Sequence, residues 1–288
     1  MNQTPKDAPL LVFDLKPLKD QASKPRELIK ITGHESLSLT ARRAITVLWH
    51  SAHRQGLEAG KDYVVEINDL RPGNTRNNDI VVEAILALMK TIITVPLPNG
   101  GVRQVQFLGG NDITDQDRPY GILTYSFDKR LVEILQDSKI WGTISLPVLM
   151  SLSSKYAVSL YELASQWIGL NRKTSETIPI EELRALLGVD LTKYPTFGGL
   201  NKYVLQPAIL EINALAPFSL TMLLIKTGRK VTHVRIHWRT KSIPEHKEAW
   251  DELHRPKVGR KARINKDEDV IIGPVSGFNY LTHKSGKD

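Results

Sequence analysis

The sequence predicts an α+β fold in which the chain is built from two similar modules, one after the other. At 288 residues the chain is longer than the roughly 100–200 residues of a typical domain. Helical periodicity followed by two strand-like segments and a turn occurs once in residues 38–145 and again in residues 146–241. Residues 1–37 contain four prolines and little periodicity, so we expect an N-terminal arm there, and residues 242–288 form a C-terminal tail.

The first module is predicted to begin with an amphipathic helix. Ser38 and Thr40 are both good N-caps, and the apolar residues from Ala41 to Ala52 recur at helical spacing. Pro98–Gly101 contains turn residues suited to positive φ between two strand-like segments, which predicts a β-hairpin. The remaining predicted elements are a strand over 62–68, a helix from Asn77 or Asn78 to Met89, the hairpin strands 91–97 and 102–108, a strand over 120–126 and a helix over 127–135.

The second module repeats this order. Its predicted elements are a lead-in over 146–149, a helix around 157–168, a helix over 180–187, a long helix from Thr196, and strands over 220–226 and 231–239. Gly188 is placed to end the 180–187 helix, and Pro207 should kink or split the long helix. Helices followed by a β-hairpin are the order of a winged helix, which is a helix-turn-helix with a hairpin wing. We therefore predict two tandem winged-helix domains in a pseudo-twofold arrangement.

The charge of the chain is concentrated in the second module. Lys and Arg total 39 against 31 Asp and Glu, a formal net charge of +8. Residues 146–241 hold 12 basic and 6 acidic residues, whereas residues 1–145 hold 18 and 17. This surplus favours a polyanionic partner, such as nucleic acid or an anionic membrane surface. A basic domain whose charges are merely solvated is the alternative, unless the charges converge on one face.

Composition and motifs exclude several kinds of chemistry. The sequence has no cysteine, which excludes disulfides, thiolate zinc sites and a cysteine nucleophile. No apolar run approaches the roughly 18 residues of a membrane span, and no phosphate-binding loop or nucleophile elbow is present. The three carboxylates within 111–117 lack the spacing of a calcium loop, so we expect a polar loop there. We expect a soluble, cytoplasmic protein that is not an enzyme and has no cofactor, no metal and no membrane partner.

The last predicted hairpin is a candidate DNA-binding wing. Side chains alternate across a strand, so Thr232, Val234, Ile236 and Trp238 share an apolar face while His233, Arg235, His237 and Arg239 share the other. Lys226, Arg229 and Lys230 lie at the tip or ends of the hairpin. This cationic arrangement suits contacts with DNA phosphates, although a solvated strand face is the alternative. His233 and His237 would lie about 13 Å apart on the strand, too far to share a metal ion.

The long helix is the candidate recognition helix. Its polar face would carry Gly198, Gly199, Asn201, Lys202 and Gln206, with Lys193 and Thr196 just before it. Asn and Gln can pair with adenine edges, Lys can contact guanine or phosphate, and glycines let the backbone approach closely. A polar helix face in water is the alternative.

The tail is predicted to contain a short helix around 246–254, followed by a cluster of basic residues. We expect this cluster to be a solvated segment. It comprises Arg255, Lys257, Arg260, Lys261 and Arg263.

Four segments resemble the iteron-binding Rep proteins, the replication initiators of theta-replicating plasmids. Ser154–Leu163 is similar to the family's SKYxxxLYELL helix, and Ile178–Gly188 resembles the helix that follows it. Phe197–Asn213 resembles the recognition helix, including its internal proline, and Gly228–Trp238 resembles the wing. The resemblance covers roughly 150–240; residues 38–145 share only the element order, and residues 242–288 match nothing. The recognition segment here carries fewer Lys and Arg than is usual in the family.

The resemblance implies a function that composition alone does not. Such initiators bind double-stranded DNA at direct repeats in the plasmid origin, help to open an adjacent A·T-rich segment, and recruit the host initiator and replicative helicase. As dimers they bind an operator inverted repeat and repress their own promoter. The first winged helix would supply the dimer interface and accessory DNA contacts, and the second the main DNA contacts. The protein would then lie in the bacterial cytoplasm with plasmid DNA at the nucleoid.

Two other functions are alternatives. A two-module winged-helix transcriptional repressor without a role in initiation would need the same basic domain. A DNA-nicking enzyme would need a His-x-His metal pair beside a nucleophilic tyrosine, and the sequence lacks that pair.

Overall fold

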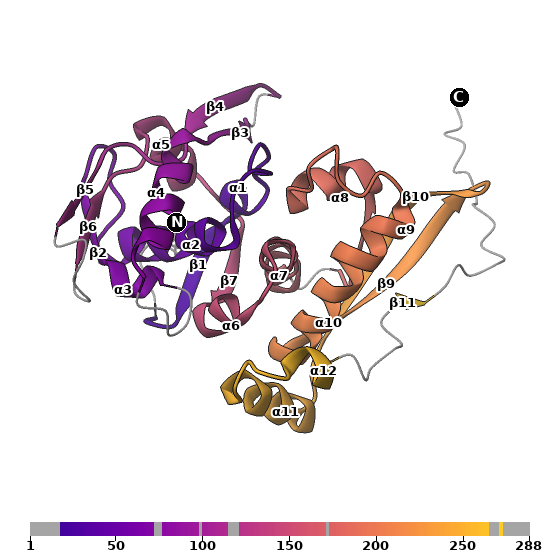
Figure 1. Ribbon diagram of the computed structural model, residues 1–288. Helices are drawn as coiled ribbons and strands as arrows, with labels where there is room; N and C mark the ends of the chain where they lie inside the picture. Colours follow the sequence, from indigo (N-terminus) through magenta and orange to yellow (C-terminus); the bar gives the residue numbers. More distant parts are fainter. Residues whose placement is uncertain are drawn as a thin grey trace, which may run out of the picture. The chain divides into compact units, whose positions relative to one another are not determined.

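The computed structural model describes residues 18–71, 77–97, 100–114, 121–170, 173–264 and 271–272. The chain divides into two compact units, Met1–Ser151 and Leu152–Asp288 (Figure 1). Both contain helices and strands, so the predicted α+β class is confirmed. None of the described helices is long and apolar enough to cross a membrane.

The first unit is a set of helices with three small antiparallel sheets. In chain order it contains β1 (Gln21–Pro25), α1 (Arg26–Ile29), α2 (Leu39–Arg54), β2 (Tyr63–Glu66), α3 (Ile67–Leu70), α4 (Asp79–Lys90), β3 (Ile92–Pro96), β4 (Val102–Gln106), β5 (Asn111–Thr114), β6 (Ile122–Tyr125), α5 (Lys129–Gln136), β7 (Trp141–Ser145) and α6 (Leu146–Ser151). Strand β1 pairs with β7, β6 lies between β2 and β5, and β3 pairs with β4. The β3–β4 hairpin confirms the predicted strand pair, although residues 98–99 of its turn lie outside the described residues.

Helix α2 organises the core of the first unit. Ser38 caps it as predicted, since its hydroxyl accepts a hydrogen bond from the Ala41 amide at 3.2 Å. Trp49 is fully buried and donates its indole N–H to the Ser23 carbonyl at 2.7 Å, which ties β1 to the helix. The buried Tyr125 hydroxyl donates to the Leu48 carbonyl of α2. Burial raises the pKa of this phenol.

Residues 18–37 belong to this unit, although the sequence assigns them to an arm. Leu28, Ile29 and Leu37 are buried, and β1 adds a strand to β7. Pro25 ends the strand and precedes α1, so the proline that suggested irregular chain is a boundary between two elements. The remainder of the predicted arm, residues 1–17, lies outside the described residues.

The polar loop predicted over 111–117 is also different in the structure. Residues 111–114 form β5, an edge strand whose residues pair in register with β6. Polar side chains are tolerated on an edge strand because one side of it faces solvent. Asp115 and Asp117, the other two carboxylates of that segment, lie outside the described residues.

The second unit has the element order of a winged helix with an added tail. It contains α7 (Lys155–Gly169), β8 (Ser175–Pro179), α8 (Ile180–Leu187), α9 (Phe197–Leu200), the π-helical turn η2 (Asn201–Leu205), α10 (Gln206–Leu215), β9 (Phe218–Thr227), β10 (Lys230–Thr240), α11 (Ile243–His254), α12 (Arg260–Ile264) and β11 (Ile271–Ile272). Its sheet has the order β11-β9-β10-β8. Strand β8, which the sequence does not predict, pairs antiparallel with β10.

The core of the second unit confirms the predicted alternation of β10. Val234, Ile236 and Trp238 are buried, and the ring of Trp238 stacks on that of Trp167 from α7 at a centroid distance of 5.4 Å. One face of the hairpin therefore packs against helices, which fixes the direction of the opposite face.

The long helix changes type just before its proline, whereas the sequence predicts a kink or a split there. Thr196 caps the first turn by accepting from the Gly199 amide at 3.1 Å. The π-helical turn η2 follows, and α10 begins with Pro207 in its first turn. Proline lacks the N–H that would complete the α-helical ladder, so a change of helix type just before it is the expected consequence. Gly188 ends α8 in the left-handed conformation, with φ of 58°, which confirms that prediction.

The tail is folded onto the unit rather than solvated. Ala249 of α11 is buried, and a capping box of Ser242 and Glu245 begins the helix. The Glu252 carboxylate accepts from Arg263 at 2.7 Å and from Arg260 at 3.2 Å, which joins α11 to α12. Hydrogen bonds from Arg263, and then from Arg260, hold the pKa of the Glu252 carboxyl below its usual range. Two members of the predicted basic cluster are therefore structural.

Candidate nucleic-acid interface

The tip of the β9–β10 hairpin presents a group of cations. Lys226, Arg229 and Lys230 are all exposed, and Gly228 turns the chain with a φ of 61°. The hairpin extends away from α11, because β10 runs from the tip back to the segment that enters α11 (Figure 1). Three flexible cations at the end of a rigid hairpin suit contacts with phosphates.

The predicted cationic face of β10 is more enclosed than the sequence indicates. His233, Arg235 and His237 are half-buried, because β8 and β9 lie on either side of the strand. Arg235 donates from Nε to the hydroxyl of Thr177, its cross-strand neighbour on β8, at 2.9 Å. Nε2 of His237 is buried without a hydrogen-bond partner in the described structure.

Arg239 is engaged at the opposite end of the strand from the tip. Its guanidinium donates to both carboxylate oxygens of Glu245, at 2.9 and 2.5 Å. The bidentate pair raises the pKa of Arg239 and fastens the start of α11 to the sheet. This geometry indicates a structural contact for Arg239.

The predicted recognition helix, Phe197–Asn213, is called the recognition segment below. It presents a face of glycines, one lysine and one aromatic ring. Gly198 and Lys202 are exposed and Gln206 is half-buried, in keeping with the predicted polar face. Asn201 is turned partly inward, and its Oδ1 is buried without a hydrogen-bond partner in the described structure. Tyr203, for which the sequence predicts no role, is 56% exposed on this face.

A buried arginine holds the turn that leads into the recognition segment. Arg184 of α8 donates to the carbonyl oxygens of Lys193, Tyr194 and Asp190, at 2.7, 2.9 and 3.2 Å. Within the same turn, the Asp190 carboxylate accepts from the Thr192 hydroxyl at 2.6 Å and from its amide at 2.8 Å. These hydrogen bonds lower the pKa of Asp190. The arrangement presents Lys193 and Thr196, both exposed, immediately before α9.

Two family models match the chain over these elements. Residues 21–165 match the model described as initiator replication protein, WH1, and residues 179–238 match the model described as initiator Rep protein, WH2. The chain belongs to the initiator replication protein family. Comparison with curated protein sequences finds no match for this initiator. Family membership confirms the two predicted winged-helix domains and the resemblance on which the function was inferred.

The family places the initiator among proteins of plasmid replication that bind DNA through winged helices and are generally non-catalytic. The structure brings the predicted site residues of the initiator into two groups within the second unit. One is the hairpin tip, and the other is the recognition segment with the turn before it. In Figure 1 the hairpin tip and α9 both lie toward the end of the second unit that is remote from α11, and α10 runs from α9 toward α11.

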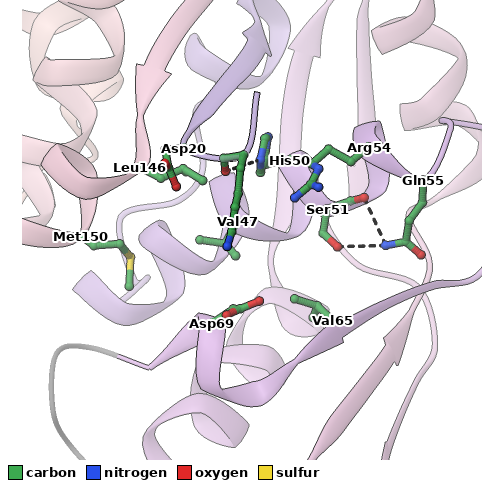
Figure 2. Close-up of a pocket in the computed structure, with 11 residues that line it drawn as sticks. Asp20, Val47, His50, Ser51, Arg54, Gln55, Val65, Asp69, Leu146 and Met150 are labelled. Carbon is green, nitrogen blue, oxygen red and sulfur yellow. Dashed lines mark hydrogen bonds between the residues drawn. The ribbon is translucent and has the colours of Figure 1, made fainter. Parts of the chain in front are cut away.

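The first unit of the initiator contains a separate open depression of about 480 Å³. Lys19 and Arg54 line it together with Asp20 and Asp69, so its charges are mixed. His50 also lines the depression, and burial is the main cause of the lowered pKa of this imidazole. Figure 2 shows the Gln55 amide beside Ser51, to which it donates a hydrogen bond of 2.9 Å. Among the described residues no group of three His, Asp or Glu side chains is arranged to hold a metal ion.

Proposed function

We propose that the chain is a sequence-specific, double-stranded DNA-binding initiator that recognises repeated sites in a plasmid origin. The observation that carries this proposal is that the cationic hairpin tip and α9, the start of the recognition segment, lie toward the same end of the second unit. A helix beginning at Thr196 can enter the major groove while the tip residues Arg229 and Lys230 contact the adjacent backbone.

The proposed role at the origin follows from family membership and the two-unit organisation. Bound initiator would promote opening of an adjacent A·T-rich segment and recruit the host initiator and the replicative helicase. A dimer formed through residues 38–145 would bind an inverted repeat in its own promoter and act as an autorepressor. Residues 146–241 would make the main DNA contacts in both states.

The salt dependence of DNA binding tests the proposed interface. Replacing Arg229 and Lys230 together with glutamine removes two tip cations from an exposed hairpin. If both neutralise phosphates, the slope of log affinity against log salt becomes shallower by about 1.8, at about 0.9 for each contact with B-DNA. A matched control replaces the exposed Lys247 and Lys261 of α11 and α12, and should retain the wild-type slope.

Fluorescence anisotropy on the origin repeats and on a scrambled duplex supplies these measurements. Equal slopes for the tip variant, the control variant and the wild type would remove the hairpin from the interface. Replication of a plasmid carrying the origin then separates initiation from repression. A chain that represses its promoter but supports no replication would be a transcriptional repressor only.

A further inference from the structure

The recognition segment holds two tyrosines in a fixed geometry. The rings of Tyr194 and Tyr203 stack with centroids 5.7 Å apart and an angle of 25° between their planes. The Lys202 ammonium lies 5.4 Å from the centroid of the Tyr203 ring, within the range of a cation–π contact. Aromatic stacking and the cation thus restrain a side chain that is otherwise 56% exposed.

The turn before the helix holds the backbone of Tyr194. Tyr194 has a φ of 53°, the one positive value of a non-glycine residue in the described structure. Residues other than glycine rarely adopt this left-handed backbone conformation unless their surroundings impose it. Such residues occur frequently at functional sites. Here the guanidinium of Arg184 holds the Tyr194 carbonyl at 2.9 Å and the preceding carbonyl at 2.7 Å.

The neighbours of the ring pair leave it accessible. A Cβ at Gly198 would meet nothing within 4 Å, and one at Gly199 would touch Tyr194 at 3.7 Å. The space beside Gly198 is therefore open, so a ligand can approach the backbone at the start of the helix closely. Tyr203 also lies in the π-helical turn η2, a type of helical irregularity found frequently at functional sites.

Within this mostly polar face, the exposed ring of Tyr203 is an apolar surface bordered by cations. Lys193 and Lys202 are its exposed cations, and no Arg lies between Lys193 and Gln206. An ordered ring costs little conformational entropy on binding, so an exposed and immobilised tyrosine suits a specific apolar contact. In the major groove the apolar group that distinguishes base pairs is the C5 methyl of thymine.

We propose that Tyr203, held by Tyr194, forms a subsite for the thymine methyl group of a T·A pair in the recognised repeat. This inference rests on the proposed function and adds to it a residue and a base. Tyr203 reads the base directly, whereas Arg184 and Tyr194 are positioning residues that act through it. Lys202, beside the Tyr203 ring, and Lys193, which precedes Tyr194 in the chain, would contact the phosphates that border the same groove.

Replacing thymine with uracil in the duplex tests this subsite, because uracil lacks only the methyl group. Single substitutions are made at every thymine of the origin repeat, and binding is measured by anisotropy. Wild type and Tyr203→Phe should each lose about fourfold in affinity at one or two positions, the effect of one buried methyl group. Tyr203→Ala should bind more weakly overall and lose its sensitivity at those positions alone.

Trp250→Ala is the matched control, because this 64%-exposed aromatic lies on α11 and should leave the uracil profile as in the wild type. Circular dichroism confirms the fold of each variant, and retention of binding by Tyr203→Phe separates loss of the ring from loss of the fold. Repeat-selective binding with a uracil profile that Tyr203→Ala leaves unchanged would overturn the subsite alone. Equal binding of wild type to the repeat and to a scrambled duplex would overturn the proposed function and the subsite with it.

Discussion

Removing the Arg184 guanidinium should loosen the turn that enters the recognition segment and weaken both folding and DNA binding. The side chain is buried, with 6% of its surface exposed, and it donates to three carbonyl oxygens. The change to test is Arg184→Met, which keeps an apolar stem of similar length and deletes the hydrogen-bonding group. Without the guanidinium, the positive φ of Tyr194 loses the contacts that impose it.

The magnitude follows from the two short hydrogen bonds, at 2.7 and 2.9 Å. A hydrogen bond to a charged group contributes about 1.5–3 kcal/mol, so two give about 3–6 kcal/mol. Lys193 is exposed, so water can replace part of what its carbonyl loses. Relaxation of Tyr194 out of the left-handed region returns about 1–3 kcal/mol. We therefore expect the free energy of unfolding of the second unit to fall by about 2–3 kcal/mol.

Urea denaturation measures this loss, and anisotropy on the origin repeat measures the effect on binding under native conditions. Affinity should fall at least about tenfold, because the turn carries Lys193 and the Thr196 cap into the interface. Arg184→Lys is the informative companion, since an ammonium keeps the charge but cannot reproduce the planar fork. An Arg184→Met protein that unfolds at the wild-type urea concentration and binds the repeat with wild-type affinity would refute the positioning role.

Two further substitutions test the assignment of structural cations. Glu252→Gln should speed amide hydrogen exchange in α11 and α12 by about tenfold or more, since it removes the carboxylate that pairs with Arg260, Arg263 and, at 3.8 Å, Arg255. The pKa of the Glu252 carboxyl is lower in the folded protein than in the unfolded chain, so the carboxylate stabilises the tail at neutral pH. The wild-type protein should therefore lose protection from exchange in the tail as the pH falls below about 4.3. Unchanged exchange would contradict the ion-pair role. Arg239→Gln should reduce DNA affinity less than Arg229→Gln, because Glu245 already engages Arg239; an equal reduction would place Arg239 at the phosphates.

Local rules were sufficient for much of the second unit. The alternation of Val234, Ile236 and Trp238 gives the buried face of β10, and the cap at Thr196 follows from a hydroxyl ahead of an apolar stripe. Strand β8 could not be predicted in the same way. Its residues, Ser175–Pro179, are mostly polar, and they form a strand because the edge of β10 offers them hydrogen-bonding partners.

Long-range pairing explains what the sequence could not show in the first unit. Gln21–Pro25 becomes a strand by pairing with Trp141–Ser145. The paired residues are more than a hundred positions apart in the sequence. Neither segment has a strong strand pattern alone. Periodicity detects a face that one element buries, but it does not detect which distant backbone completes a hydrogen-bond ladder.

Regular helical spacing explains which side chains of the recognition segment are exposed. At about 100° per residue, Asn201 lies on the same side of the helix as Leu205 and Ala208, which are both buried, so it is turned partly inward. Tyr203 lies on the opposite side and is exposed, although the sequence predicts no role for it. Arg184 was missed for a different reason. Its partners are backbone carbonyls of a turn, which residue composition does not reveal.

The net charge of the second module overstates the charge available to DNA. Arg184 holds a turn, Arg239 is paired with Glu245, and Lys241 donates to a backbone carbonyl while burial lowers its pKa. The exposed cations that remain on the proposed interface lie at the hairpin tip and in or just before the recognition segment: Lys193, Lys202, Lys226, Arg229 and Lys230. We therefore expect phosphate binding to be divided between these two small groups rather than spread over a basic surface. A recognition helix with so few cations needs another source of selectivity, and in our proposal the ordered ring of Tyr203 is that source.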